Sequence, residues 1–272
     1  MPYDPQTYWS RLHARGNLSA VGQSGLPVRL NRLLYRALER RVRGYVRHHR
    51  LLPAARAFDV GAGTGFWVAQ WHGLGATRVD GCDLVPDAVA NLEGAYGAQG
   101  DRFVVADIGS PTPGLPDEHY ELVSVMNVLL HLVDDDAFGR ALGAVASLVA
   151  PGGHLLLVEP ILFDASFVRP WSPDQASRAR PLAAYRDPLL AVGLEVVDVR
   201  GAVALANNPI EARSRARFAR YERWWDWLRL RAKAGPLPRW LGPAMLAGDR
   251  LALALGEAPS SKLALFRRPP AA

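Results

Sequence analysis

The chain has 272 residues, a net charge of +6 at neutral pH and one cysteine, Cys82. A single cysteine excludes an internal disulfide and a cysteine-based metal cluster, and we expect no metal site. No uncharged apolar run reaches the roughly 20 residues of a membrane span, and the first residues do not read as a secretory signal. We therefore expect a cytoplasmic protein. A basic balance can indicate a nucleic-acid partner, but almost all of this charge is arginine in an alanine- and glycine-rich chain, so a compositional cause is favoured.

About fifty residues precede the first expected strand. Tyr8 and Trp9 stand near their start, and the spacing of apolar residues predicts an amphipathic helix over 28–48. Asn31 and Tyr35, four residues apart, share one face of that helix and can point toward a ligand. Simple packing with a solvated basic face is the favoured alternative.

From residue 56 to 200, short apolar runs alternate with helical stretches, which predicts an α/β fold with a parallel sheet covered on both faces. The expected strands are 57–60, 78–82, 103–106, 120–126, 154–159 and 194–199, and the expected helices are 65–72, 86–96, 134–149 and 181–192. Asp134 supplies a cap for the third of these helices. Cys82 falls within a strand and is expected to be a small apolar filler.

The strand rhythm stops between residues 201 and 258. Two helices are expected there, over 210–231 and 239–255, before a last strand at 262–266. The first helix carries an aromatic stripe formed by Phe218, Tyr221, Trp224, Trp225 and Leu228. We favour packing of this stripe onto the core; a roof over a ligand pocket and, least favoured, contact with a membrane surface remain alternatives. Four segments result: 1–50, 51–200, 201–258 and 259–272.

The stretch from Phe58 to Phe66 reads as a strand, a tight turn and a helix. Its glycines follow Asp59 as Asp-x-Gly-x-Gly-x-Gly, at positions 61, 63 and 65. Glycine accepts positive φ and lets a ligand lie against bare backbone, so this is a cofactor loop. A dinucleotide fingerprint, G-x-G-x-x-G, would need its third glycine one residue later, where Phe66 stands.

Polar residues also stand at the ends of five successive strands: Asp59, Asp83, Asp107, Asn127 and Glu159. Each alone has an ordinary explanation as a turn former or helix cap. In an open parallel sheet, however, the carboxyl ends of the strands meet where ligands bind. Together these residues predict a polar ligand site at one edge of the sheet.

These motifs, with the turn Pro151-Gly152-Gly153, resemble class I S-adenosylmethionine-dependent methyltransferases of the small-molecule type, over residues 56–200. The resemblance implies a Rossmann-like seven-stranded sheet with an antiparallel last strand, an N-terminal helical lid, a helical cap inserted before that strand, and S-adenosylmethionine as cofactor, with S-adenosylhomocysteine as product. It places the amino-acid end of the cofactor on Gly61, Ala62, Gly63 and Gly65, with Asp59 at the ammonium. The ribose hydroxyls are expected on Asp83. The adenine is expected between Leu84 and Ile108, beside Asp107, and Asn127 is the last of the expected cofactor-binding residues.

The implied activity is methyl transfer to a small-molecule acceptor, with O-methylation of a hydroxylated or carboxylated secondary metabolite favoured. His131 and Glu159 are the candidate general bases, since a hydroxyl nucleophile must lose its proton. Tyr8, Trp9, Asn31 and Tyr35 are the candidate lid and acceptor contacts, and the candidates for meeting an acidic acceptor are Arg169, Arg178, Arg180 and Arg186. An RNA or protein methyltransferase, disfavoured by the absence of a Pro-Pro-aromatic motif after Asn127, and a non-catalytic cofactor-binding module stay as alternatives. The acceptor and the oligomeric state stay open.

Overall fold

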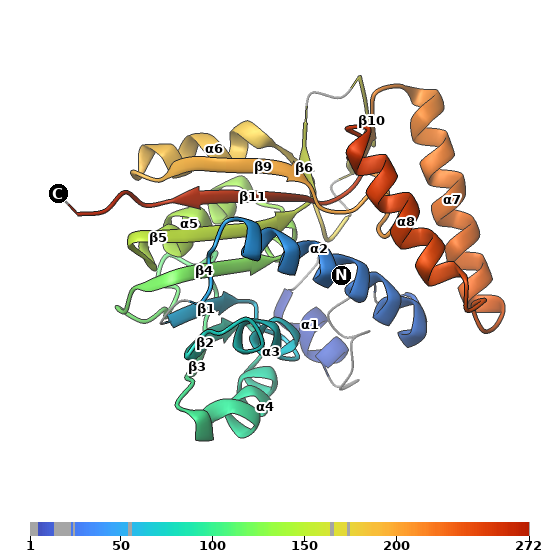
Figure 1. Cartoon of the computed structure of the whole chain (residues 1–272). Helices are drawn as coiled ribbons and strands as arrows, with labels where there is room; N and C mark the ends of the chain where they lie inside the picture. Colours follow the sequence, from blue (N-terminus) through green and yellow to red (C-terminus); the bar gives the residue numbers. More distant parts are fainter. Residues whose placement is uncertain are drawn as a thin grey trace.

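The computed structural model describes residues 5–13, 23, 25–53, 56–163, 166–172 and 175–271. Its centre is a seven-stranded sheet in the order β3-β2-β1-β4-β5-β11-β9 (Figure 1). The strands are β1 Arg56–Val60, β2 Arg78–Asp83, β3 Phe103–Val105, β4 Tyr120–Met126, β5 Val149–Glu159, β9 Glu195–Gly201 and β11 Lys262–Arg267. Only β11 pairs antiparallel with its neighbours in this sheet. The expected sheet, including its antiparallel last strand, is confirmed.

The strand order reverses beside β1. This strand pairs in parallel with β2 on one side and with β4 on the other, although β2 follows it directly in the chain and β4 does not. The helices after these two neighbours therefore leave in opposite directions, and a crevice opens beyond their carboxyl ends. That crevice is the place where the fold favours a ligand.

Helices cover both faces of the sheet. One face carries α3 (Phe66–His72), α4 (Pro86–Tyr96) and the second half of α2 (Val28–His48), and the other carries α5 (Asp135–Ser147) and α6 (Leu182–Ala191). The expected cap of α5 is present, because Asp134 Oδ1 accepts a hydrogen bond from the backbone N–H of Ala137 at 2.8 Å. Three shorter helices complete this part: α1 Pro5–His13, η1 Gly97–Gln99 and η2 Leu129–His131.

The cap consists of α7 (Arg215–Ala234) and α8 (Leu241–Ala254), which lie together beyond one end of the sheet (Figure 1). They form a second core with the first half of α2, in which Leu30, Trp225 and Leu228 are buried. Phe218 is buried as well, so the expected packing of the aromatic stripe is confirmed for Phe218, Trp225 and Leu228, while Tyr221 and Trp224 are half-buried. Helix α2 and the cap therefore share one apolar core.

The helix expected over 210–231 begins later than predicted, because residues 211 and 212 form a strand. This strand, β10 (Glu211–Ala212), pairs with β7 (Phe167–Val168), and Ser214 then caps α7. A second small sheet joins β6 (Ile161–Leu162) to β8 (Arg180–Pro181). Strands of two residues leave almost no periodic signal, and the sequence does not predict them. Among the residues described above, no helix is long and apolar enough to cross a membrane.

Candidate functional site

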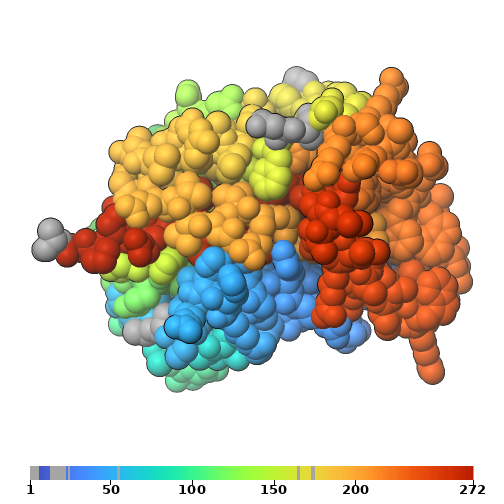
Figure 2. Space-filling view, turned by 45° about the horizontal axis from the view of Figure 1, so that its top comes forward, coloured from blue at the N-terminus to red at the C-terminus, as the bar shows by residue number. Residues whose placement is uncertain are grey.

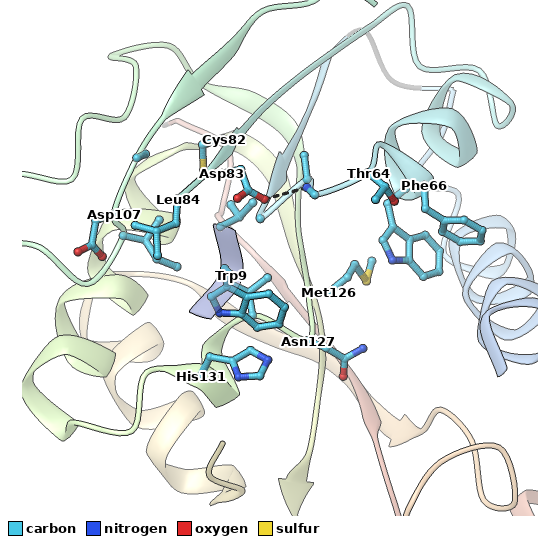
Figure 3. Close-up of a pocket in the computed structure, with 18 of the residues that line it drawn as sticks. Trp9, Thr64, Phe66, Cys82, Asp83, Leu84, Asp107, Met126, Asn127 and His131 are labelled. Carbon is cyan, nitrogen blue, oxygen red and sulfur yellow. Dashed lines mark hydrogen bonds between the residues drawn. The ribbon is translucent and has the colours of Figure 1, made fainter. Parts of the chain in front are cut away.

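A pocket opens at the carboxyl ends of β1, β2, β3 and β4 (Figure 3). The lining comes from the glycine loop, the four strand ends and the helices α1 and α2: Trp9, Tyr35, Val60, Gly61, Ala62, Gly63, Thr64, Phe66, Trp67, Cys82, Asp83, Leu84, Ala106, Asp107, Ile108, Met126, Asn127, Val128, His131 and Leu132. Most of the sequence-predicted cofactor residues are thus brought together. Gly65, at the start of α3, and Asp59 are outside this lining.

The glycine loop needs its glycines for two physical reasons. Gly61, Gly63 and Gly65 all have positive φ, at 68°, 56° and 76°. A Cβ on Gly61 would also lie 2.5 Å from Val128 Cγ2. The N–H groups of Ala62, Gly63 and Gly65, however, already donate within the protein. The loop offers a close, flat backbone surface rather than an open row of donors.

Replacing Gly61 with alanine is expected to weaken S-adenosylmethionine binding by about tenfold or more. The alanine must keep the left-handed backbone conformation of Gly61, which costs roughly 1–2 kcal/mol. Its Cβ also displaces Val128 at the pocket wall. Titration calorimetry measures the change. Gly94→Ala in α4 is the matched control, since a Cβ there has open space, and equal cofactor affinity in both variants would contradict the assignment.

Asp83 links strand β2 to the glycine loop. Its Oδ2 accepts from the Gly63 N–H at 2.9 Å, drawn dashed in Figure 3, and its Oδ1 accepts from the Val85 N–H at 3.0 Å. Each carboxylate oxygen can accept more than one hydrogen bond, so the two ribose hydroxyls of the cofactor still find acceptors here. Asp83 both shapes the loop and faces the pocket.

Asp107 and the apolar residues beside it suit a planar ring. The Asp107 carboxylate is exposed to the pocket, and its Oδ1 accepts from the Gly109 N–H at 3.0 Å. Leu84 and Ile108 line the same side of the pocket and offer apolar faces. A carboxylate beside two apolar faces matches an adenine with its exocyclic amine.

Asp59 does not line the pocket, so a direct contact with the cofactor ammonium is corrected, and the alternative, a contact through water, stays a prediction. It is buried within β1, and its Oδ1 accepts from the Ser124 hydroxyl at 2.6 Å. Trp71 Nε1 in turn donates to Ser124 Oγ at 3.0 Å. Burial raises the pKa of Asp59 to about 7. The carboxyl group therefore belongs to a buried polar network beneath the loop.

His131 lies at the mouth of the pocket, in η2 just after β4. Its Nδ1 is 2.9 Å from the carbonyl oxygen of Ala176. A carbonyl only accepts, so Nδ1 carries the proton and Nε2 keeps its lone pair. Burial lowers the pKa of His131 below its usual value, which keeps the ring neutral near pH 7. The ring also contacts Trp9 edge-to-face, with centroids 4.7 Å apart (Figure 3).

Glu159 is fully buried and lines neither this pocket nor its neighbour, which corrects its prediction as a candidate general base. Its Oε1 accepts from the N–H groups of Val128 and Leu129 at 2.8 and 2.9 Å, and its Oε2 from that of Leu130 at 3.1 Å. These residues lead directly into His131. Glu159 is thus a positioning residue that holds the loop carrying the histidine.

A second pocket adjoins the first and shares five lining residues with it: Trp9, Tyr35, Trp67, Asn127 and His131. Tyr8 lines this second pocket. Asn31 also lies in its wall, but the Asn31 side chain forms hydrogen bonds with the turn before α2. Asn31 Oδ1 accepts from the Gln23 N–H, and its Nδ2 donates to the carbonyls of Gln23 and Leu26. The expectation that Asn31 points toward a ligand is therefore wrong. Asn31 has a structural role, because it fixes the turn before α2. Asn127 borders both pockets from a left-handed backbone, φ 59°.

Two of the four candidate arginines line the second pocket. Arg169 and Arg178 do so, and they are ion-paired with Glu222 and Asp135. Arg180 is instead buried against Asp135, and Arg186 pairs with Asp187 on the surface. Sequence reasoning missed the remaining polar lining, which comes from segments that are far apart in the chain: Gln23, Gln175, Ser177, Asn207, Asn208 and Ser261. No local pattern marks such residues.

The comparisons with known proteins agree with this geometry. Residues 57–153 match the family described as "Methyltransferase domain". The ubiquinone biosynthesis O-methyltransferase of Xanthomonas campestris pv. campestris is 35% identical over 118 residues, which is 42% of this chain and 46% of that protein. The chain thus spans less than half the length of that relative.

Solved structures share the fold at lower identity. A putative sarcosine dimethylglycine methyltransferase from Galdieria sulphuraria aligns with a TM-score of 0.52 at 15% identity, covering 86% of each chain. The [4+2]-cyclase SpnF aligns with a TM-score of 0.54 at 19% identity, covering 85% of this chain and 81% of that one.

The residues present fit S-adenosylmethionine. A close backbone surface at the glycine loop, carboxylate acceptors at Asp83 and Asp107, and apolar faces at Leu84 and Ile108 follow one another along the pocket. They match a charged amino-acid end, a ribose and an adenine in that order. Residues 57–153 match a methyltransferase domain, and S-adenosylmethionine is the cofactor that their pocket fits.

Proposed function

We propose that this protein transfers the methyl group of S-adenosylmethionine to an oxygen of a small acceptor, a hydroxylated or carboxylated metabolite. The acceptor occupies the second pocket, next to the end of the cofactor site where His131 and Asn127 lie. Aromatic side chains, Tyr8, Trp9 and Trp171 among them, line that pocket together with neutral amides. Among the described lining residues no carboxylate is present. Such a lining favours a neutral or anionic acceptor with an apolar or aromatic body.

The observation that carries the proposal is the fixed tautomer of His131. The hydrogen bond to Ala176 commits Nδ1 as a donor and leaves Nε2 as a base on a neutral ring. The residue borders both pockets, so it stands between cofactor and acceptor. A hydroxyl nucleophile needs this group more than an amine or a carbanion does, because its proton must leave as the oxygen is methylated.

The cofactor, when bound, supplies a methyl group already activated by the sulfonium charge. The protein therefore has to align the acceptor and exclude water. Trp9 and Tyr35 lie over the shared region of the two pockets, and Tyr35 contacts Phe66 edge-to-face with centroids 4.8 Å apart. His131 takes the acceptor proton on Nε2 and returns it to solvent. These aromatic side chains hold the acceptor in line and keep the site dry.

A second candidate is a protein that binds the cofactor and uses the same pocket for other chemistry. The fold likeness to a [4+2]-cyclase favours keeping this candidate, because a shared fold alone does not establish methyl transfer. An RNA or protein substrate has less support, since the second pocket is walled by the helices α1 and α2 and by the segment 203–210.

Two measurements test the proposal. Titration calorimetry is expected to show binding of S-adenosylmethionine and S-adenosylhomocysteine and no comparable binding of NAD. Incubation with methyl-labelled cofactor and separate pools of phenols, alcohols, carboxylic acids and amines is expected to label a phenol, alcohol or carboxylic acid pool. Label in the amine pool alone would overturn the assignment to oxygen, and cofactor binding with no labelled product in any pool would favour the second candidate.

A further inference from the structure

The outer face of α8 carries large apolar side chains that nothing in the described chain covers. Trp240, just before the helix, is 62% exposed, Leu251 is 63% exposed and Leu255, just after it, is 65% exposed. Ala244 and Ala247 between them are exposed as well. We call these five residues the α8 stripe. Figure 2 shows α8 lying open on the face of the molecule beside α7.

The spacing of the α8 stripe makes it one continuous surface. Its members follow one another at intervals of three or four residues, which places them on the same side of a helix. The opposite side of α8 carries Leu241 and Met245, which are buried in the core shared with α2. The stripe is therefore a second apolar face of α8, in addition to the one that stabilises the cap.

Arginines surround the α8 stripe. Leu251 and Leu255 line a groove between α7 and α8 together with Trp224, Arg213 and Arg220. Arg250 is exposed next to the stripe on α8 itself. The segment 211–257 has ten basic residues against five acidic ones, a net +5, and the first fifty residues have ten against two, a net +8. The cap is thus one of two strongly basic parts of the chain.

The acidic residues of the cap do not offset this field at the stripe. Glu222, Asp226 and Glu257 are each ion-paired with an arginine, and Glu211 pairs with the buried Lys262. Asp249 is buried and accepts from the N–H groups of residues 204 and 205. Arg220 and Arg250, in contrast, are exposed. The surface is apolar along its centre and cationic at its rim.

We propose that the α8 stripe and its arginine rim dock the protein on an anionic lipid surface. Tryptophan and leucine enter the headgroup boundary, and arginines meet lipid phosphates and anionic headgroups. A second copy fits less well, because pairing stripe with stripe would bring two segments of net +5 together. A nucleic acid leaves the leucines without a partner. The proposal does not depend on the methyl-transfer activity, since α8 lies outside both pockets of the site.

Sedimentation with vesicles tests the docking. The full chain is expected to sediment with vesicles of phosphatidylcholine plus phosphatidylglycerol, not with phosphatidylcholine alone, and the bound fraction is expected to fall as salt rises. Leu251→Gln with Leu255→Gln is expected to lower partitioning about tenfold or more. Arg220→Gln with Arg250→Gln is expected to lower it about 25-fold, since each basic residue near an anionic surface contributes roughly fivefold.

The matched control is Leu190→Gln with Val192→Gln. These residues are 44% and 46% exposed at the end of α6, on the main domain, and their replacement is expected to leave binding unchanged. Circular dichroism and cofactor affinity check that every variant is folded. Equal vesicle binding by the leucine variant and wild type would overturn the proposal. So would light scattering that shows a wild-type dimer lost in the leucine variant, with no vesicle binding by either protein.

Discussion

Replacing His131 with alanine is expected to lower kcat by about 10²–10⁴-fold while the affinity for S-adenosylmethionine stays within a few-fold of wild type. A positioned general base contributes about this much to rate. The ring lies at the edge of the cofactor pocket, so its loss removes little of the cofactor contact. Single-turnover kinetics with the acceptor found by methyl labelling, together with calorimetry on the cofactor, separate the two effects.

The role of His131 as a base also predicts how the rate changes with pH. The base works in its neutral form, and burial lowers the pKa of His131. The rate of wild type is therefore expected to rise from acid pH, to level off below the ordinary histidine pKa of about 6.5, and to stay level through neutrality. His131→Ala is expected to lose this acid limb. His119→Ala is the control, because His119 is exposed away from both pockets; an unchanged limb in His131→Ala would show that another group is the base.

Replacing Glu159 with alanine is expected to lower the free energy of unfolding by about 2–4 kcal/mol and to lower kcat with it. Three backbone N–H groups lose their acceptor, and each such group costs roughly 1–3 kcal/mol when it stays buried. The loop they belong to carries His131, so the base shifts. Denaturant unfolding measures the first effect and steady-state kinetics the second.

Glu159→Gln separates positioning from charge. The glutamine oxygen can keep the bonds to Val128 and Leu129, so activity is expected to recover largely. Burial raises the pKa of Glu159 to about 8, so the folded chain holds the proton more tightly than the unfolded chain. This contribution to stability is complete below about pH 4.5 and disappears as pH rises through 8. The glutamine variant is expected to lack that slope. Glu195→Ala, in an exposed ion pair, is the control, and full loss of activity in Glu159→Gln would contradict a positioning role.

Local signals explain what the sequence could predict. Strand, glycine turn and helix follow one another within a few residues around Gly61 to Gly65. Asp83 ends β2, and Asp107 and Asn127 follow β3 and β4 within two residues. Parallel pairing then brings these ends to one edge without any further information. The fold and the outline of the cofactor pocket therefore follow from short-range pattern.

Burial and distant contacts explain what the sequence could not predict. Asp59 and Glu159 stand at strand ends like the other carboxylates. Yet Asp59 accepts a hydrogen bond from Ser124, and Glu159 accepts hydrogen bonds from the loop 128–130, so both carboxyl groups are buried. Both contacts join residues at least 29 positions apart in the chain. Asn31 likewise turns to Gln23 rather than to the pocket. A strand end shows that a polar group lies near the site, and only packing decides which way it faces.

The helix α2 carries a mechanical consequence. It runs unbroken for 21 residues, about 30 Å, with its first half in the core shared with the cap and its second half on the sheet. Tyr35 lies between these halves and lines both pockets. A hinge motion of the cap as a rigid body would have to bend α2 or displace Tyr35 together with the cap. We therefore expect acceptor and product to enter and leave beside the short helix α1, where Trp9 contacts His131 edge-to-face.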